Sequence, residues 1–234
     1  DPETYALVGE IDTHGVGPHE IVMMPDARTI AVANGGISTR EDSGDDPLNL
    51  DTMRSTLAYL DLASGTLVDE QTVPEPKASI RHIAVTGDAT VVVAMQIQRE
   101  ALADSEPRPL IAVQRPGGRL EALEDGVELG TAMVDYTGAV AVDERSRIAA
   151  VTSPRGSLAA FWNIDTGRRS GHVELSDVCG VTVSAARRRF VLSGAGGHLR
   201  FVDADTVQEV VEERTRFSDV VWDNHMLALA GEPS

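Results

Sequence analysis

An internal repeat constrains the fold of this chain more than any other feature. Short segments with alternating apolar side chains recur along its 234 residues, and similar polar or glycine-containing turns separate them. Each unit contains up to four such segments, every one of them short enough to be a β-strand. Four units follow one another, and a half-unit with two strands ends the chain. The units occupy residues 19–74, 79–125, 137–175 and 178–213, and the half-unit occupies 217–230.

Four antiparallel strands repeated at a period of about 40 residues are typical of a β-propeller. We therefore expect an all-β chain that folds as a single β-propeller domain, residues 1–234, with about five blades' worth of chain. Residues 5–11 look like an outermost strand, which we expect to pair with the C-terminal half-unit and complete a fifth blade. The first two units are longer because polar and acidic loops, residues 37–56 and 98–108, separate their second and third strands.

Composition excludes several classes of partner. Twenty Lys and Arg against 37 Asp and Glu give a net charge of −17, which repels phosphate backbones, so we expect no nucleic-acid partner. No apolar run approaches the ~18 residues of a membrane-spanning helix, and we expect no membrane span. Cys179 is the only cysteine, so no disulfide forms within the chain.

The start of each innermost strand and the loop between the second and third strands of each blade reach the same face of a propeller, around its central channel. A transition-metal site is one hypothesis for this channel mouth. His19, His82 and Cys179 would be ligands, with Glu20 or Asp219 as a carboxylate ligand. Imidazole, thiolate and carboxylate groups suit iron, copper or zinc. The alternative is that the histidines hydrogen-bond to neighbouring blades and that Cys179 is a small buried hydrophobe.

A pocket for a small anion or organic acid is the second hypothesis for the same face. Arg81 and Arg155 carry guanidinium groups that bind carboxylates in a bidentate manner, and Asn34, Gln96 and Ser153 add polar groups from the loops. The alternative is that each arginine neutralises a neighbouring Asp or Glu.

Two further functions remain open. Propellers that resemble lactonases place similar residues at this mouth, so Glu20 or His82 could act as a general base in a hydrolase; that reading rests on fold analogy alone. Unpaired strands near Tyr5 and at Val220–Trp222 would favour a homodimer through blade edges, or an interaction scaffold.

Six segments together resemble a bacterial family known as domain-of-unknown-function family 1513. They are His14–Glu20, Ala33–Ile37, Asn49–Met53, Ser79–His82, Thr152–Gly156 and Asp177–Val181. The resemblance implies an exported, periplasmic, seven-bladed propeller, often encoded beside iron-uptake components, with about two N-terminal blades more than this chain. It also implies a non-catalytic binding or accessory protein, with a metal ion, a small ligand or a periplasmic protein as partner. It supplies no catalytic residues.

Overall fold

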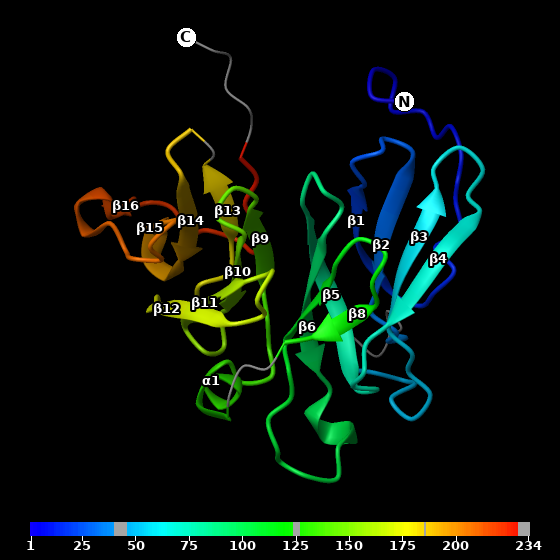
Figure 1. The fold of residues 1–234 in the computed structure, drawn as a ribbon, viewed down its shortest axis with the longest axis horizontal. Coiled ribbons are helices and arrows are strands. Elements are labelled where there is room, and N and C mark those ends of the chain that lie inside the picture. The colour runs from blue at the N-terminus through cyan, green and yellow to red at the C-terminus, as the bar shows by residue number, and fades with distance from the viewer. Residues whose placement is uncertain (40–45, 124–126, 185, 229–234) are drawn as a thin grey trace.

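The computed structural model describes residues 1–39, 46–123, 127–184 and 186–228. Their strands form four four-stranded antiparallel sheets, each a simple up-and-down meander, arranged as adjacent blades (Figure 1). The innermost strands contact one another in the order β1, β5, β9 and β13. The all-β propeller architecture predicted from the repeat is therefore confirmed.

The blades coincide with the four sequence units. Blade 1 contains β1 (Pro18–Met23), β2 (Thr29–Asn34), β3 (Thr56–Asp61) and β4 (Leu67–Thr72). Blade 2 contains β5 (Ala78–Val85), β6 (Val91–Ile97), β7 (Ile111–Gln114) and β8 (Leu120–Ala122). Blade 3 contains β9 (Ala139–Asp143), β10 (Ile148–Ser153), β11 (Leu158–Asn163) and β12 (Arg169–Glu174). Blade 4 contains β13 (Val181–Ser184), β14 (Arg189–Gly194), β15 (His198–Asp203) and the two-residue β16 (Thr215–Arg216).

Short helical turns interrupt the connections between strands. The one α-helix among the described residues is α1 (Val127–Ala132), which lies between blades 2 and 3 and was not expected from the sequence. Three 3₁₀ turns complete the structure: η1 (Arg99–Ala101), η2 (Ala195–Gly197) and η3 (Val211–Glu213). In the described part of the chain, no helix is both long enough and apolar enough to cross a membrane.

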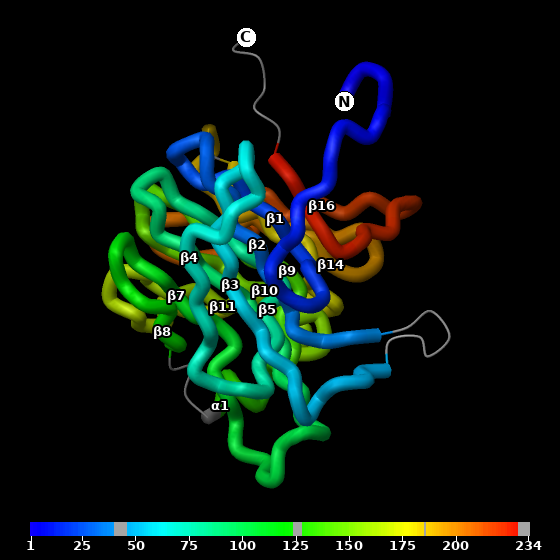
Figure 2. Tube along the Cα trace, turned by 90° about the vertical axis from the view of Figure 1, so that its right-hand side faces the viewer, coloured from blue at the N-terminus to red at the C-terminus, as the bar shows by residue number. Residues whose placement is uncertain are grey.

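The expected fifth blade is not formed. Residues 5–11 and 217–228 contain no strand, and Tyr5, Leu7 and Val8 are 91%, 78% and 83% exposed. The N-terminal segment runs along blade 1 (Figure 2), whereas the amide of Ala228 donates a hydrogen bond to Thr182 Oγ1 on β13, 3.1 Å away. The C-terminal segment also passes the innermost strands, with the His225 ring 4.7 Å from that of His82 on β5, and does not pair with residues 5–11. Neither segment therefore supplies the backbone partner that the other needs to become a strand.

The outer strand of the fourth unit also differs from expectation. The apolar alternation of the fourth unit, residues 178–213, predicts its last strand at residues 207–211. In the structure this segment forms only an isolated bridge between Val202 and Glu209, and the two-residue β16 lies further along the chain. Val207 has a left-handed backbone, with φ at 56°, because it closes the turn that begins at Asp203. A β-branched residue held in that conformation cannot start a strand.

The blades pack face to face through strands that are apolar on both sides. On β11, Phe161 and Trp162 are both fully buried although successive side chains point to opposite faces of the sheet. Trp162 belongs to the core shared by blades 1 to 3, and Phe161 packs edge-on against Phe190 of blade 4, with ring centroids 5.4 Å apart. Blade 3 therefore contributes to two cores at once.

Side-chain hydroxyls connect neighbouring blades at the channel mouth. Ser79 Oγ donates to Gly35 O at 2.8 Å and joins blade 2 to blade 1. Thr137 Oγ1 donates to Met95 O at 2.8 Å and joins blade 3 to blade 2. Thr152 Oγ1 donates to Cys179 O at 2.6 Å and joins blade 3 to blade 4. These bonds hold the starts of the innermost strands at defined positions around the channel.

We predict that Phe161→Ala lowers the free energy of unfolding by about 3–5 kcal/mol, because it leaves a cavity between blades 3 and 4. Urea unfolding monitored by circular dichroism measures the change. Val68→Ala, on β4 where the side chain is 63% exposed, is the matched control and should change stability by less than about 0.5 kcal/mol. Equal effects of the two variants would contradict close packing between these blades.

Candidate functional site

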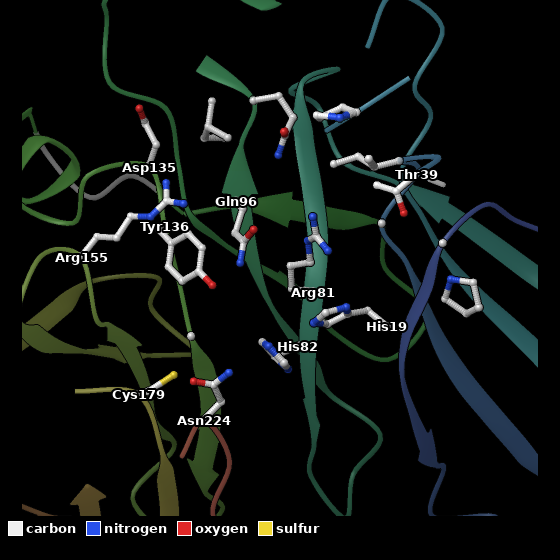
Figure 3. A pocket seen from close by; sticks show the side chains of 18 of the residues that line it. His19, Thr39, Arg81, His82, Gln96, Asp135, Tyr136, Arg155, Cys179 and Asn224 are labelled. Carbon is white, nitrogen blue, oxygen red and sulfur yellow. The ribbon is translucent and has the colours of Figure 1, made fainter. Parts of the chain in front are cut away.

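A cavity of about 690 Å³ opens at the face where the innermost strands begin, and residues from all four blades contribute to its wall (Figure 3). The repeat therefore places residues that are far apart in sequence around one space, as expected for a channel mouth. Most of the candidate site residues line it. These are His19, Arg81, His82, Gln96, Arg155 and Cys179.

Four other candidate residues do not line this cavity. The Glu20 carboxylate accepts a hydrogen bond from the Ile83 amide at 2.7 Å and lies 3.3 Å from His82 Nδ1, so it joins β1 to β5. Asp219 is exposed, and its carboxylate accepts a hydrogen bond from the adjacent Ser218 hydroxyl at 3.2 Å.

Asn34 and Ser153 are buried at the ends of β2 and β10, where they satisfy backbone groups. The Asn34 amide donates to Thr13 O at 2.9 Å, and the Ser153 hydroxyl donates to Met133 O at 2.7 Å. Both side chains therefore hold neighbouring loop backbone in place without lining the cavity. The sequence pattern places them at the correct ends of their strands, but it does not show which way their side chains point.

Three histidine rings form a cluster on one side of the cavity, through one edge-on and one tilted contact. The ring centroids of His19 and His82 lie 4.9 Å apart, and those of His82 and His225 lie 4.7 Å apart. Partial removal from water, the nearby Arg81 charge and the two other histidines lower the pKa of His19 to about 4. Burial and His82 also lower the pKa of His225. His19 and His225 are therefore neutral at pH 7, when each imidazole offers one N–H donor and one acceptor.

Cys179 lies apart from this histidine cluster (Figure 3). Burial, together with the charges of Asp177 and Asp223, raises the pKa of the Cys179 thiol to about 11, so the thiol is protonated at neutral pH. Its Sγ lies against Gly138, where an added Cβ would be only 2.7 Å away. Among the residues that the structure describes, no group of three or more His, Cys, Asp or Glu side chains is arranged to hold a metal ion. The metal site at His19, His82 and Cys179 stays a prediction.

Two arginines contribute positive charge to the cavity. The Arg155 guanidinium carbon lies 4.2 Å from the centre of the Tyr136 ring, a cation–π contact. Arg81, on β5, is half-buried, and its charge contributes to the lowered pKa of His19. Figure 3 shows Gln96 between the Arg155–Tyr136 pair and Arg81, and the Gln96 amide donates to Thr137 O at 3.2 Å.

Several lining residues were missed in the sequence, notably Tyr136, Gln98, Asn224 and His225. Asn224 and His225 fall between the two strands expected in the half-unit, where a turn was the obvious interpretation. Tyr136 precedes Thr137, the start of the third unit, so its place next to a predicted mouth residue was the available signal.

The acidic insertion after β2 is described only in part. Of its acidic run at 41–46, residues 41–45 lie outside the described residues. Further on, the Asn49 amide donates to Gly36 O at 2.9 Å, and its Oδ1 accepts from the Ser38 amide at 2.7 Å. Pro47 lines the cavity. The described part of this loop is therefore anchored beside the mouth.

A radial set of four-stranded blades around a channel with a cavity at its mouth defines a β-propeller. The solved structures of U3-55K and of the RRP9 WD40 repeats share this fold, each with a TM-score of 0.60 and 12% sequence identity over 86% of this chain. The chain spans about half the length of each, 53% and 52% respectively. No curated protein sequence matches it.

Comparison with sequence models of protein families identifies the family of this chain. The chain belongs to the DUF1513 family, described as "Protein of unknown function", whose model matches residues 1–229. The resemblance seen in the six sequence segments is thereby confirmed.

We predict that folding is less stable below neutral pH partly because of His19. Its pKa is near 4 in the folded protein and 6.5 without the fold, so the unfolded chain binds the proton first and stability falls as the pH drops through this window. His19→Gln should make the free energy of unfolding less dependent on pH, because the substitution removes this imidazole. Arg81, His82, His225 and Glu20 are present in both the wild type and the variant, so they do not account for the difference between them.

Urea unfolding at a series of pH values between about 4 and 7 measures the difference. The control is His172→Gln, an exposed histidine on β12 outside the cavity. Parallel pH profiles for His19→Gln and the wild type would show that the environment of His19 is not as described.

Proposed function

We propose that this chain is a non-catalytic binding or accessory protein of the periplasm, with a small-ligand site at the mouth of the propeller channel. The observation that carries the proposal is the convergence of polar side chains from all four blades on one cavity of about 690 Å³. This volume is within the range of small-molecule sites. The periplasmic location and a part in iron or other metal acquisition rest on the family resemblance.

Binding fits the geometry better than hydrolysis does. A general base must be able to reach a substrate proton, but the Glu20 carboxylate accepts a hydrogen bond from the Ile83 amide and does not line the cavity. His82 is buried between Glu20 and two other histidine rings. The Cys179 thiol is protonated at neutral pH, since its pKa is raised to about 11, and a protonated thiol is a poor nucleophile.

Thermal unfolding with a panel of organic acids, sugars and metal ions, including iron, copper and zinc, tests the proposal. A ligand at about 100 times its Kd stabilises the fold by about 2.7 kcal/mol, which raises the Tm by about 5–10 °C for a chain of this size. Tyr136→Ala should reduce the shift, because it removes a ring from the cavity wall.

Tyr5→Ala is the matched control, since Tyr5 is 91% exposed and outside the cavity. If no compound in the panel shifts the Tm, the small-ligand function is wrong and the interaction-scaffold alternative gains support. If Tyr5→Ala and Tyr136→Ala weaken binding equally, the ligand site is not this cavity.

We also propose that the chain, as it stands, self-associates through blade 1. Ile21 and Met23 on β1 are 58% and 46% exposed, whereas their cross-strand neighbours on the same face, Val32 and Ile30, are 0% and 8% exposed. Two apolar side chains of this face are therefore open to solvent. That face lies at the free end of an open arc. A second copy is the occupant we propose, because the same exposed apolar pair on both copies makes this surface self-complementary about a two-fold axis.

Light scattering should therefore show a dimer at high concentration, and Ile21→Asn should shift the equilibrium toward monomer. Val68→Asn, an equally surface-exposed change on β4, should leave the dimer intact. A wild-type monomer at every concentration would contradict self-association.

A further inference from the structure

The charge of the cavity differs from that of the chain as a whole. The protein carries a net charge of −17. Among the described lining residues, the carboxylates are Glu100 and Asp135, and Asp135 accepts two hydrogen bonds from Arg99, at 2.7 and 2.6 Å. Arg81 and Arg155 add two guanidinium groups to the wall. With the Asp135 charge balanced by Arg99, the described wall attracts anions although the protein as a whole repels them.

The contacts of Arg155 differ from those of the ion-paired arginines elsewhere in the protein, and this difference points to a ligand. On the opposite face of the arc of blades, Arg28, Arg147 and Arg189 each form an ion pair with an aspartate near the end of the third strand of their blade. The contact described for Arg155 is with the Tyr136 ring, and its side chain is exposed. A guanidinium held over an aromatic ring has its position restrained without using its N–H donors on a carboxylate.

Arg81 lies on a different wall. It belongs to β5 of blade 2, beside His19, whereas Arg155 follows β10 of blade 3. Figure 3 shows both guanidinium groups directed into the cavity, with Gln96 between them. A ligand that reaches both groups must therefore carry negative charge at two separated positions. A single inorganic ion would fill little of a space of about 690 Å³.

We propose that the ligand of this site is a small organic acid with at least two carboxylates, one bound by Arg155 and another by Arg81, with the Gln96 amide between them. This inference rests on the proposed function, because it names the ligand class of the same cavity. Charge-assisted bonds between guanidinium and carboxylate supply the affinity, and the separation of the two arginines supplies the specificity for polyacids over monoacids. The neutral imidazole of His19 adds a hydrogen-bond donor beside Arg81.

Titration calorimetry at constant ionic strength with citrate, succinate and acetate tests the proposal. We expect citrate or succinate to bind at least about ten times more tightly than acetate, since acetate makes one of the two charged contacts. Arg155→Gln and Arg81→Gln should each weaken polyacid binding by about 10- to 100-fold. In each of these variants, the ratio of the affinity for polyacids to the affinity for acetate should fall toward one.

The matched control is Arg145→Gln, which removes an exposed arginine in the turn between β9 and β10, away from the cavity. It changes the net charge by the same amount and should leave polyacid affinity unchanged. Because Arg81 is half-buried, a thermal scan checks that the Arg81→Gln variant is folded. If that variant is unfolded, the variant of the exposed Arg155 decides the outcome.

Three results would overturn the inference. Acetate could bind as tightly as the polyacids, Arg145→Gln could weaken binding as much as Arg155→Gln, or the only ligands found in the wider panel could be neutral molecules or cations. In the last case the small-ligand function stands and only the ligand class is wrong. If no compound binds at all, both proposals fail together.

Discussion

Face-to-face packing of sheets that are apolar on both sides is the constraint on which this structure depends. The second and third strands of blades 1 to 3 are largely buried, as β10 shows, where every residue from Ile148 to Ser153 is buried. A four-stranded sheet of this kind cannot be stable alone, because each face needs a cover. Blades 2 and 3 obtain a cover on both sides from their neighbours. The two end blades have one blade neighbour each, which leaves Ile21 and Met23 of blade 1 exposed.

Packing alone would allow the blades to rotate or slide relative to one another, and polar contacts at the channel mouth limit this. The hydroxyls of Ser79, Thr137 and Thr152 each connect one blade to a backbone carbonyl of the next. Glu20 connects β1 to the Ile83 amide in the same region. A buried hydrogen bond left unmade is costly, so each contact specifies the position of a strand start. The cavity wall is built from those strand starts, and the relative placement of the blades and the geometry of the site therefore have the same origin.

The repeat predicted the blades well because both of its signals are local. Alternating apolar residues and the turns between them marked the strands of units 1 to 3 to within a few residues, since a turn such as Asn163–Gly167 closes through its own side chain. Residues 5–11 show the limit of this reasoning. Their alternation is that of a strand, but a strand also needs a backbone partner, and no pattern within the segment shows whether one is present. The strand predicted at residues 207–211 was wrong for a local reason, because a turn holds Val207 in a left-handed conformation.

The sequence by itself determined the class of fold, the family, the positions of the blades and several of the residues that face the channel mouth. Equivalent positions in a repeat occupy equivalent places in a radial structure, so His19, Arg81, His82 and Cys179 were assigned to one face without coordinates. Only the tertiary structure decided which side chains enter the cavity. Glu20, Asn34 and Ser153 turn to satisfy backbone groups, whereas His225 and Asn224 enter from a C-terminal segment with no repeat equivalent. Side-chain direction depends on contacts made across blades, and those contacts exist only after the chain has folded.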